Sequence, residues 1–332
     1  MQNIVIVGSG FIARQHAQAI QEEPGVRLAA FVNPNPKNAG KLAEEFGCAY
    51  YPGLREAAAG TRVDVVDICA PTHLHEQYAV EAAGLKCHVL CEKPVTFTLE
   101  SFDRMVSACR ENGVAFMVAQ AARWWPEFVV IQDYLQQGRL GEPRMIYEKR
   151  LCQLPPWSTW HRDPKKSGGG LYDLNIHDID FLASILGRPE QVYAVGHKTP
   201  EGCWMHVATS LTWASGVRAV VETCLDMPGP WPFSIELRAT GSKGTLHYNL
   251  QAGVNIADGQ SNSNFTWYPA GEAQPQELTA PPVDMFRAEI REFLDAVREG
   301  REPSVTVAQN RLVLEIVLAT LRSLEEGRAV AL

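Results

Sequence analysis

The first 120 residues or so alternate regularly between short apolar runs and segments with helical periodicity, and this feature most constrains the fold. The apolar runs, which are candidate strands, lie at residues 3–7, 27–32, 63–69, 86–91 and 114–118. The candidate helices between them lie at residues 11–21, 37–46, 73–83 and 99–112. Strands this uniformly apolar are covered on both faces, which indicates a parallel sheet with crossover helices. The alternation predicts a doubly wound α/β Rossmann domain.

Beyond residue 124 the pattern changes, because strand-like segments follow one another without intervening helices. They lie at residues 144–151, 191–197, 205–212, 218–225, 233–240 and 244–250, with one helix at residues 173–186. Consecutive strands favour a large, mostly antiparallel, open-faced sheet in an α+β domain. We therefore expect a nucleotide-binding domain at residues 1–121 and a substrate-binding and oligomerisation domain at residues 122–332.

Two helices are expected near the end of the chain. The first is indicated by one apolar stripe, formed by Phe286, Ile290, Phe293, Leu294 and Val297. The second opens at Thr306-x-x-Gln309, which is a capping-box pattern. The domain assignment leaves open that these helices pack back on the first domain.

Composition excludes several classes of function. The net charge of −8 argues against a nucleic-acid partner, which usually needs a basic face. No run approaches 18 consecutive apolar residues, so no membrane span is expected. Residues 4–7 are too short for a signal-peptide core, and the eight cysteines show no CxxC pair. We therefore expect a cytoplasmic protein with reduced thiols.

A glycine motif follows the first predicted strand and opens the first helix. It reads Gly8-Ser-Gly10-Phe11-Ile12-Ala13. The first glycine permits a tight turn, the second lets the backbone approach a pyrophosphate, and the alanine allows close packing of helix and strand. Between a strand and a helix, this pattern predicts a dinucleotide site rather than a plain glycine-rich turn.

The end of the second predicted strand bears on the choice between NAD and NADP. An acid there usually binds the ribose 2′-hydroxyl of NAD, but this chain has Asn33. An asparagine can bind a hydroxyl without repelling a 2′-phosphate, and Lys37 could pair with one. The choice stays open, with a slight preference for NAD because no arginine follows the strand.

Further motifs occur in order at matching spacing between residues 3 and 190. They are Ala70-Pro71-Thr72-His73-Leu74-His75, Glu92-Lys93-Pro94, Gly138-Arg-Leu-Gly-Glu-Pro-Arg144 and Gly168-Gly-Gly-x-x-Asp173-x-x-x-His177-x-x-Asp180. Together they resemble the Gfo/Idh/MocA family of sugar and cyclitol dehydrogenases. Three positions depart from the usual pattern, namely Asn33, Ala121 and Asn175, and they bear on cofactor preference and substrate contacts.

The resemblance implies a set of site residues. It implies that Lys93 and His177 act at the reacting hydroxyl, that Asp173 supports them or contacts the sugar, and that the Lys93–Pro94 bond is cis. The candidate cofactor-binding residues, from the motifs and the resemblance together, are Gly8, Gly10, Phe11, Ile12, Asn33, Pro71, Thr72, His75, Glu92, Lys93 and Gln120. The candidate substrate-binding residues, which include residues flanking the expected cleft, are Arg123, Trp124, Trp160, His161, Asp173 and His177.

The residue types suit the oxidation of a secondary alcohol. A histidine can accept the hydroxyl proton near neutral pH, and an ammonium group stabilises developing alkoxide charge. Asp173 and His177 lie four residues apart and so share a face of the predicted helix. Taken singly, Asp173 could be a helix N-cap, His177 a structural histidine and Lys93 a solvated surface lysine. The Asp-x-x-x-His pair lacks the further ligands of a closed zinc site, so no metal is expected.

Aromatic side chains lie near the expected cleft, and two interpretations of them stay open. Trp124, Trp125, Trp157 and Trp160 could stack on the apolar faces of a sugar or inositol ring, or they could be core or subunit-interface residues. A homodimer or homotetramer formed through the C-terminal sheet is expected from the resemblance.

Three functions compete. The leading hypothesis is an NAD(P)-dependent dehydrogenase or reductase acting on a CH–OH group of a sugar, cyclitol or related polyol. The second is a glycosidase or lyase that retains NAD and uses transient oxidation. The third is a non-catalytic dinucleotide-sensing regulator, against which the presence of Lys93 and His177 argues.

Overall fold

The computed structural model describes residues 1–154, 160–253 and 262–332. The chain divides into two compact units. Unit 1 comprises Met1–Trp124 and Val283–Arg311, and unit 2 comprises Trp125–Pro282 and Leu312–Leu332. Within the described part of the chain, no helix is both long and apolar enough to cross a bilayer.

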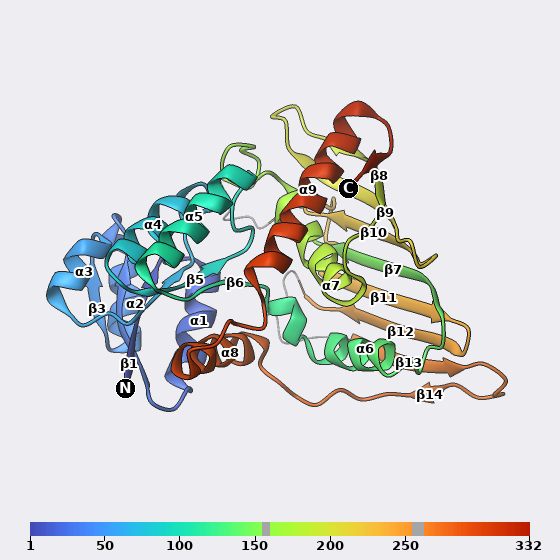
Figure 1. Ribbon diagram of the computed structural model, residues 1–332, viewed down its shortest axis with the longest axis horizontal. Coiled ribbons are helices and arrows are strands. Elements are labelled where there is room, and N and C mark those ends of the chain that lie inside the picture. The colour runs from blue at the N-terminus through green and yellow to red at the C-terminus, as the bar shows by residue number, and fades with distance from the viewer. Residues whose placement is uncertain (155–159, 254–261) are drawn as a thin grey trace. The chain divides into compact units, whose positions relative to one another are not determined.

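Unit 1 contains a six-stranded parallel sheet in the order β3-β2-β1-β4-β5-β6 (Figure 1). Its strands are β1 (Gln2–Val7), β2 (Val26–Val32), β3 (Ala49–Tyr51), β4 (Val65–Ile68), β5 (His88–Glu92) and β6 (Phe116–Ala119). The strand order changes direction between β1 and β4. This is the topological switch point of a doubly wound sheet, so the predicted Rossmann fold is confirmed.

The helices of unit 1 follow the predicted pattern closely. They are α1 (Phe11–Gln21), α2 (Pro36–Phe46), α3 (Leu54–Gly60), α4 (His75–Gly84), α5 (Leu99–Asn112) and α8 (Met285–Glu299). The sequence analysis missed β3 and α3, which have three and seven residues and are too short for their periodicity to stand out. Ile4, Ile6, Ala17, Phe293 and Leu294 share one core, so α1 and α8 cover the same face of the sheet.

Unit 2 contains a nine-stranded mixed sheet in the order β14-β13-β12-β11-β7-β10-β9-β8-β15. Its strands are β7 (Pro143–Leu151), β8 (Gln191–Lys198), β9 (Trp204–Thr212), β10 (Arg218–Cys224), β11 (Ser234–Gly241), β12 (Gly244–Gln251), β13 (Asn262–Pro269), β14 (Gln276–Glu277) and β15 (Val330–Ala331). Among the described strands of this sheet, only β7 and β10 pair in parallel, so the prediction of a mostly antiparallel sheet is confirmed. Strands β13, β14 and β15 were not predicted.

One face of this sheet is covered and the other is open. Helices α6 (Pro126–Gln136) and α7 (Ile176–Leu186) contact the covered face, where Phe128 of α6 packs against Phe181 of α7 and Tyr248 of β12. The covered face is buried at alternate positions along β9 and β12, as the two-residue period of a strand requires. Helix α6 was not predicted.

The closing helix α9 (Val307–Glu326) begins as the sequence predicts. The Gln309 N–H donates to Thr306 Oγ1 at 3.1 Å, and the Thr306 N–H donates to Gln309 Oε1 at 3.2 Å. These two reciprocal bonds are the capping box. Helix α9 passes from unit 1 to unit 2 after Arg311.

Candidate active site

Two glycines in the turn between β1 and α1, Gly8 and Gly10, have different structural roles. Gly8 has φ +124°, and a Cβ added there would lie 2.3 Å from the carbonyl oxygen of Cys69, so only glycine fits this turn. Gly10 caps the N-terminus of α1 without a side-chain cap, and a Cβ added there would meet nothing within 4 Å. At the N-terminus of α1 the backbone is therefore not covered by a side chain, and this arrangement suits the pyrophosphate of a dinucleotide.

Asn33 follows β2 at the carboxyl edge of the sheet. Its Nδ2 donates to Ser9 Oγ at 3.1 Å, and its Oδ1 accepts the N–H of Asn35 at 2.8 Å. Asn35 in turn caps α2 by accepting the N–H of Lys37. The Asn33 amide thus links the turns after β1 and β2, and it carries no charge that would repel a 2′-phosphate.

The turn after β4 is held by a buried histidine. His75 is fully buried, with Nε2 2.7 Å from the carbonyl oxygen of Ala70 and Nδ1 3.2 Å from that of Val95. Burial lowers the pKa of His75 and so favours the neutral ring, in which only one of the two nitrogens donates. His75 therefore ties the Pro71-Thr72 turn to the segment after β5, and its assignment to the cofactor site stays a prediction.

The segment after β5 carries the predicted lysine. The Lys93–Pro94 bond is cis, as the resemblance implied. The backbone N–H of Lys93 donates to Glu92 Oε2 at 3.0 Å, so the glutamate supports the turn that presents the lysine. Glu92 is buried and the Lys93 side chain is half-buried.

The end of β6 adds an amide at the same edge. Gln120 is buried, and its Nε2 lies 3.4 Å from Asn310 Oδ1. Its Oε1 meets no hydrogen-bond donor among the described residues. A buried acceptor in this state suits a polar ligand group, so the residues at this edge of unit 1 fit a dinucleotide.

Arg123 and Trp124 close the first part of unit 1. Arg123 donates to Gln309 Oε1 at 2.8 Å, and Trp124 packs, half-buried, against the core beneath α1 and α8. The alternative interpretation of Trp124 as a core residue therefore has direct support.

In unit 2 the glycine run packs against β9. A Cβ on Gly169 would lie 2.9 Å from the carbonyl oxygen of Trp204, and one on Gly170 would lie 2.4 Å from that of Met205. The helix expected at residues 173–186 begins as a π-helical turn, Leu171–Asn175, and continues as α7. Such turns are frequent at functional sites.

Asp173 lies inside that π-helical turn. Its N–H donates to the carbonyl oxygen of Gly169 at 2.9 Å, and the residue that caps the turn is Gly170. The alternative interpretation of Asp173 as a helix N-cap is therefore wrong. Its side chain and that of His177 are both half-buried.

Helix α7, which carries His177, is fixed to the sheet by a buried ion pair. The Arg150 guanidinium donates to Asp178 Oδ1 at 2.7 Å, and both side chains are buried. Glu148 lies on the same face of β7. Burial and the Asp178 carboxylate hold the pKa of Glu148 well above its ordinary range.

The remaining aromatic candidates have different environments. Trp160 stacks on His161 with ring centroids 4.2 Å apart, and His161 is buried. The indole N–H of Trp125 donates to the hydroxyl of Tyr248 at 3.1 Å, which is a structural role. Trp157 lies outside the described residues.

The predicted residues thus form two groups. The glycine turn, Asn33, the Pro71-Thr72 turn, Glu92-Lys93 and Gln120 follow β1, β2, β4, β5 and β6 of unit 1. Because the carboxyl ends of parallel strands share one edge, the fold brings these residues together. Asp173 and His177 belong to unit 2. The sequence analysis missed a buried cluster around His16, although polar residues in apolar stripes are a visible signal.

A Rossmann unit with an open glycine turn, followed by a mixed-sheet unit with an Asp-x-x-x-His segment, defines an NAD-binding oxidoreductase. A family model described as "Oxidoreductase family, NAD-binding Rossmann fold" matches residues 2–120. A second, described as "GFO/IDH/MocA C-terminal domain", matches residues 128–247. The chain belongs to the Gfo/Idh/MocA oxidoreductase family.

The chain is also similar to individual proteins and to solved structures. The chain is 25% identical over 335 residues to an inositol 2-dehydrogenase of Rhizobium meliloti, covering 98% of each protein. It is 29% identical over 203 residues to a 2,7-anhydro-N-acetylneuraminate hydratase of Escherichia coli, covering 59% of this chain and 53% of that protein. Its fold matches the aldose-aldose oxidoreductase of Caulobacter crescentus with a TM-score of 0.87 at 22% identity, covering 100% of this chain and 99% of that one.

Proposed function

We propose that this protein transfers a hydride between C4 of the nicotinamide of NAD or NADP and a secondary carbinol carbon of a sugar, cyclitol or related polyol. The observation that carries the proposal lies within unit 1. The open glycine turn and the Lys93 segment both follow strands at the carboxyl edge, on the two sides of the switch point between β1 and β4. Ligands of doubly wound sheets bind at this place. The dehydrogenases among the relatives support the substrate class.

Each site residue has a defined part in this reaction. The bound cofactor supplies the hydride acceptor or donor. In the oxidation direction, the substrate hydroxyl gives its proton to an imidazole nitrogen of His177, and the Lys93 ammonium stabilises the negative charge on the carbinol oxygen. Asp173 supports the imidazole or binds a neighbouring hydroxyl. Arg123, Trp160 and His161 are the proposed contacts to the rest of the substrate.

The first prediction concerns the two catalytic groups. Lys93→Ala and His177→Ala should each lower turnover at least ~100-fold, which is the range for positioned acid–base or electrostatic groups. Initial rates measured by absorbance at 340 nm with a panel of sugars, inositols and sugar acids test this. Lys41→Ala, at an exposed position on α2, is the control. Turnover within threefold of the parent in either site variant would reject the assignment.

The same assay also separates the two cofactors. Asn33 neither repels a 2′-phosphate nor offers a carboxylate to a 2′-hydroxyl, so we propose that both NAD and NADP bind, with NAD modestly preferred. Calorimetric titration with each dinucleotide measures the ratio. Tenfold tighter binding of NADP would contradict the preference.

A second function, transient oxidation by a retained cofactor, is favoured by the hydratases among the relatives. In that case substrate would disappear without net accumulation of reduced cofactor. A steady rise at 340 nm in step with substrate loss supports the dehydrogenase instead.

We also propose that the open face of the unit 2 sheet forms a homo-oligomer. This face carries exposed apolar side chains, including Met145, Tyr193 and Val195. It also carries polar pairs that satisfy one another across the strands, such as Lys149 with Glu236 at 2.7 Å. An exposed apolar surface rimmed by satisfied polar groups is typical of a protein interface.

A further inference from the structure

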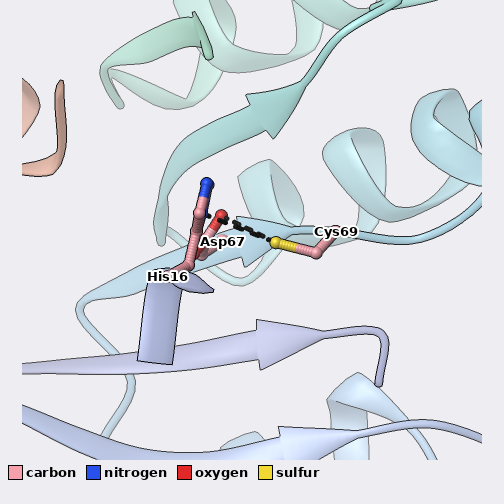
Figure 2. Close-up of side chains that lie close together, drawn as sticks. All are labelled: His16, Asp67 and Cys69. Atoms are coloured by element: carbon pink, nitrogen blue, oxygen red, sulfur yellow. Dashed lines mark hydrogen bonds and ion pairs between the residues drawn. The ribbon is translucent and has the colours of Figure 1, made fainter. Parts of the chain in front are cut away.

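A charged cluster is buried beneath the proposed cofactor site and centres on His16 of α1. The imidazole is fully buried, with Nδ1 2.9 Å from Asp67 Oδ2 and Nε2 3.2 Å from Glu92 Oε1 (Figure 2 shows His16 with Asp67 and Cys69). Glu289 of α8 also faces the ring, with Oε1 3.9 Å from Nε2. All of these residues belong to unit 1.

The periodicity of the elements explains the cluster. Val65 and Asp67 of β4 point to the same face of the sheet, as do Leu90 and Glu92 of β5, because side chains alternate along a strand. Val65 and Leu90 belong to the core that α1 and α8 cover. Asp67 and Glu92 therefore project into the layer that His16 enters from α1.

The geometry of the ring fixes its protonation. Both nitrogens of His16 face carboxylate oxygens, and a carboxylate can only accept hydrogen bonds. A neutral imidazole has one N–H, so its other nitrogen would set a lone pair against a carboxylate. A doubly protonated ring donates from Nδ1 to Asp67 and places a positively charged Nε2–H within ion-pair distance of Glu92.

The electrostatics agree with that geometry. Burial by itself lowers the pKa of His16, but the attraction and hydrogen bonds of Asp67 and Cys69 together outweigh it and raise the pKa well above its ordinary value. The other groups facing the ring are Glu92, Glu289, the Cys69 thiol and the Phe286 ring. Burial also raises the pKa of Cys69, so that group is a neutral thiol.

The cluster is connected to the proposed catalytic segment. Glu92 directs Oε1 to His16 and accepts the backbone N–H of Lys93 on Oε2. A series of polar contacts therefore runs from Asp67 to the backbone of Lys93. Asp67 is hydrogen-bonded to His16, the His16 ring lies within ion-pair distance of Glu92, and Glu92 accepts the Lys93 N–H. Glu92 is buried close to Asp67 and Glu289, so a cation at His16 offsets the repulsion among these carboxylates.

We propose that His16 is a positioning residue that acts as a buried imidazolium, clamping Glu92 and thereby the turn that presents Lys93. The link from Lys93 to catalysis rests on the proposed function, whereas the imidazolium itself does not. The Cys69 Sγ atom also contacts the ring, 3.6 Å from His16 Nδ1.

The charge state is tested by NMR on the whole protein with 15N-labelled histidine. The chain has nine histidines. At pH 8.5 one ring should show both nitrogens protonated, and this signal should disappear in His16→Gln and persist in the control His197→Gln. Asp67→Asn, nearly the same shape as aspartate, should convert that ring to a neutral form while the fold is retained. A neutral His16 ring in the parent protein would overturn the proposal.

The positioning role is tested by kinetics. His16→Gln and Asp67→Asn should lower kcat about 10- to 100-fold, because a small displacement of a catalytic group costs that much. The fluorescence and circular-dichroism signals of the folded protein should be retained. Rates within twofold of the parent in both variants, or a stoichiometric divalent metal that EDTA removes from the purified protein, would overturn the proposal.

The two proposals fail in different ways. If Lys93→Ala leaves turnover unchanged while the imidazolium signal is present, the catalytic assignment is wrong and the charge state of His16 stands. If Lys93→Ala abolishes turnover and the His16 ring is neutral, only the clamp is wrong.

Discussion

At the residue scale, the two glycines in the turn between β1 and α1 have different roles. Gly8 adopts a positive φ and leaves no room for a Cβ against the backbone of Cys69. Gly10 has no neighbour within 4 Å of an added Cβ and begins α1. Gly8 is therefore required by the fold itself, whereas the fold leaves room for a side chain at Gly10, and we propose that this room serves a ligand that approaches the backbone.

This difference gives a prediction. Gly10→Val should leave the melting temperature close to that of the parent and weaken dinucleotide binding at least ~10-fold, because the side chain occupies the space of the pyrophosphate. Gly8→Val should instead destabilise the protein by a few kcal/mol through backbone strain and collision. Thermal unfolding combined with calorimetric titration measures both effects. Unchanged affinity in Gly10→Val would show that the cofactor does not bind at this turn.

At the element scale, helix α7 depends on ionisable groups that are buried on the covered face of the unit 2 sheet. Arg150 and Asp178 fasten the helix, and Glu148 lies beside them with a raised pKa. A protonated Glu148 contributes a neutral carboxyl group where a second carboxylate would repel Asp178. The segment with Asp173 and His177 is thus held by a cluster whose stability depends on pH.

Proton linkage determines whether the contribution of Glu148 to folding stability rises or falls with pH. The folded protein retains a proton on Glu148 that the unfolded chain releases. The contribution of Glu148 to folding stability is therefore fully present below about pH 4.3, and it declines as pH rises toward the pKa of Glu148 in the folded protein. Glu148→Gln imitates the protonated form and does not titrate. Its free energy of unfolding relative to the parent should therefore increase by about 1 kcal/mol or more between pH 5 and pH 8. Urea unfolding at both pH values, with the exposed Glu142→Gln as control, measures this. Parallel shifts at the two pH values would contradict it.

At the scale of the whole molecule, the open sheet face is the surface that the described residues leave without a covering layer. Ser210 of β9 lies on this face between Tyr193 of β8 and Val220 of β10. A long charged side chain at that position cannot be accommodated in a packed interface without leaving a buried charge.

Ser210→Arg should therefore shift the protein from an oligomer to a monomer. Light scattering after size exclusion, at several concentrations, measures the mass. The control is Val129→Arg, which places the same charge at an exposed position on α6. An oligomer that survives Ser210→Arg, or a parent protein that is already monomeric, would rule out this interface.

The sequence by itself predicted the parallel sheet of unit 1 and most element bounds, and it located the motifs to which we assign the chemistry. Local signals sufficed there: apolar period, glycines at fixed positions and caps such as Thr306 with Gln309. It missed elements whose signals are weak, such as β3 and α6, because their existence depends on packing partners.

Only the tertiary structure decided what the buried polar groups do. It placed Asp173 inside a π-helical turn instead of at a helix cap, and it surrounded His16 with carboxylates from two strands and a distant helix. Periodicity shows that such residues face a core, but not which partners meet there. Those partners come from segments up to 273 positions apart, and their encounter, which sets charge and protonation, exists only once the chain has folded.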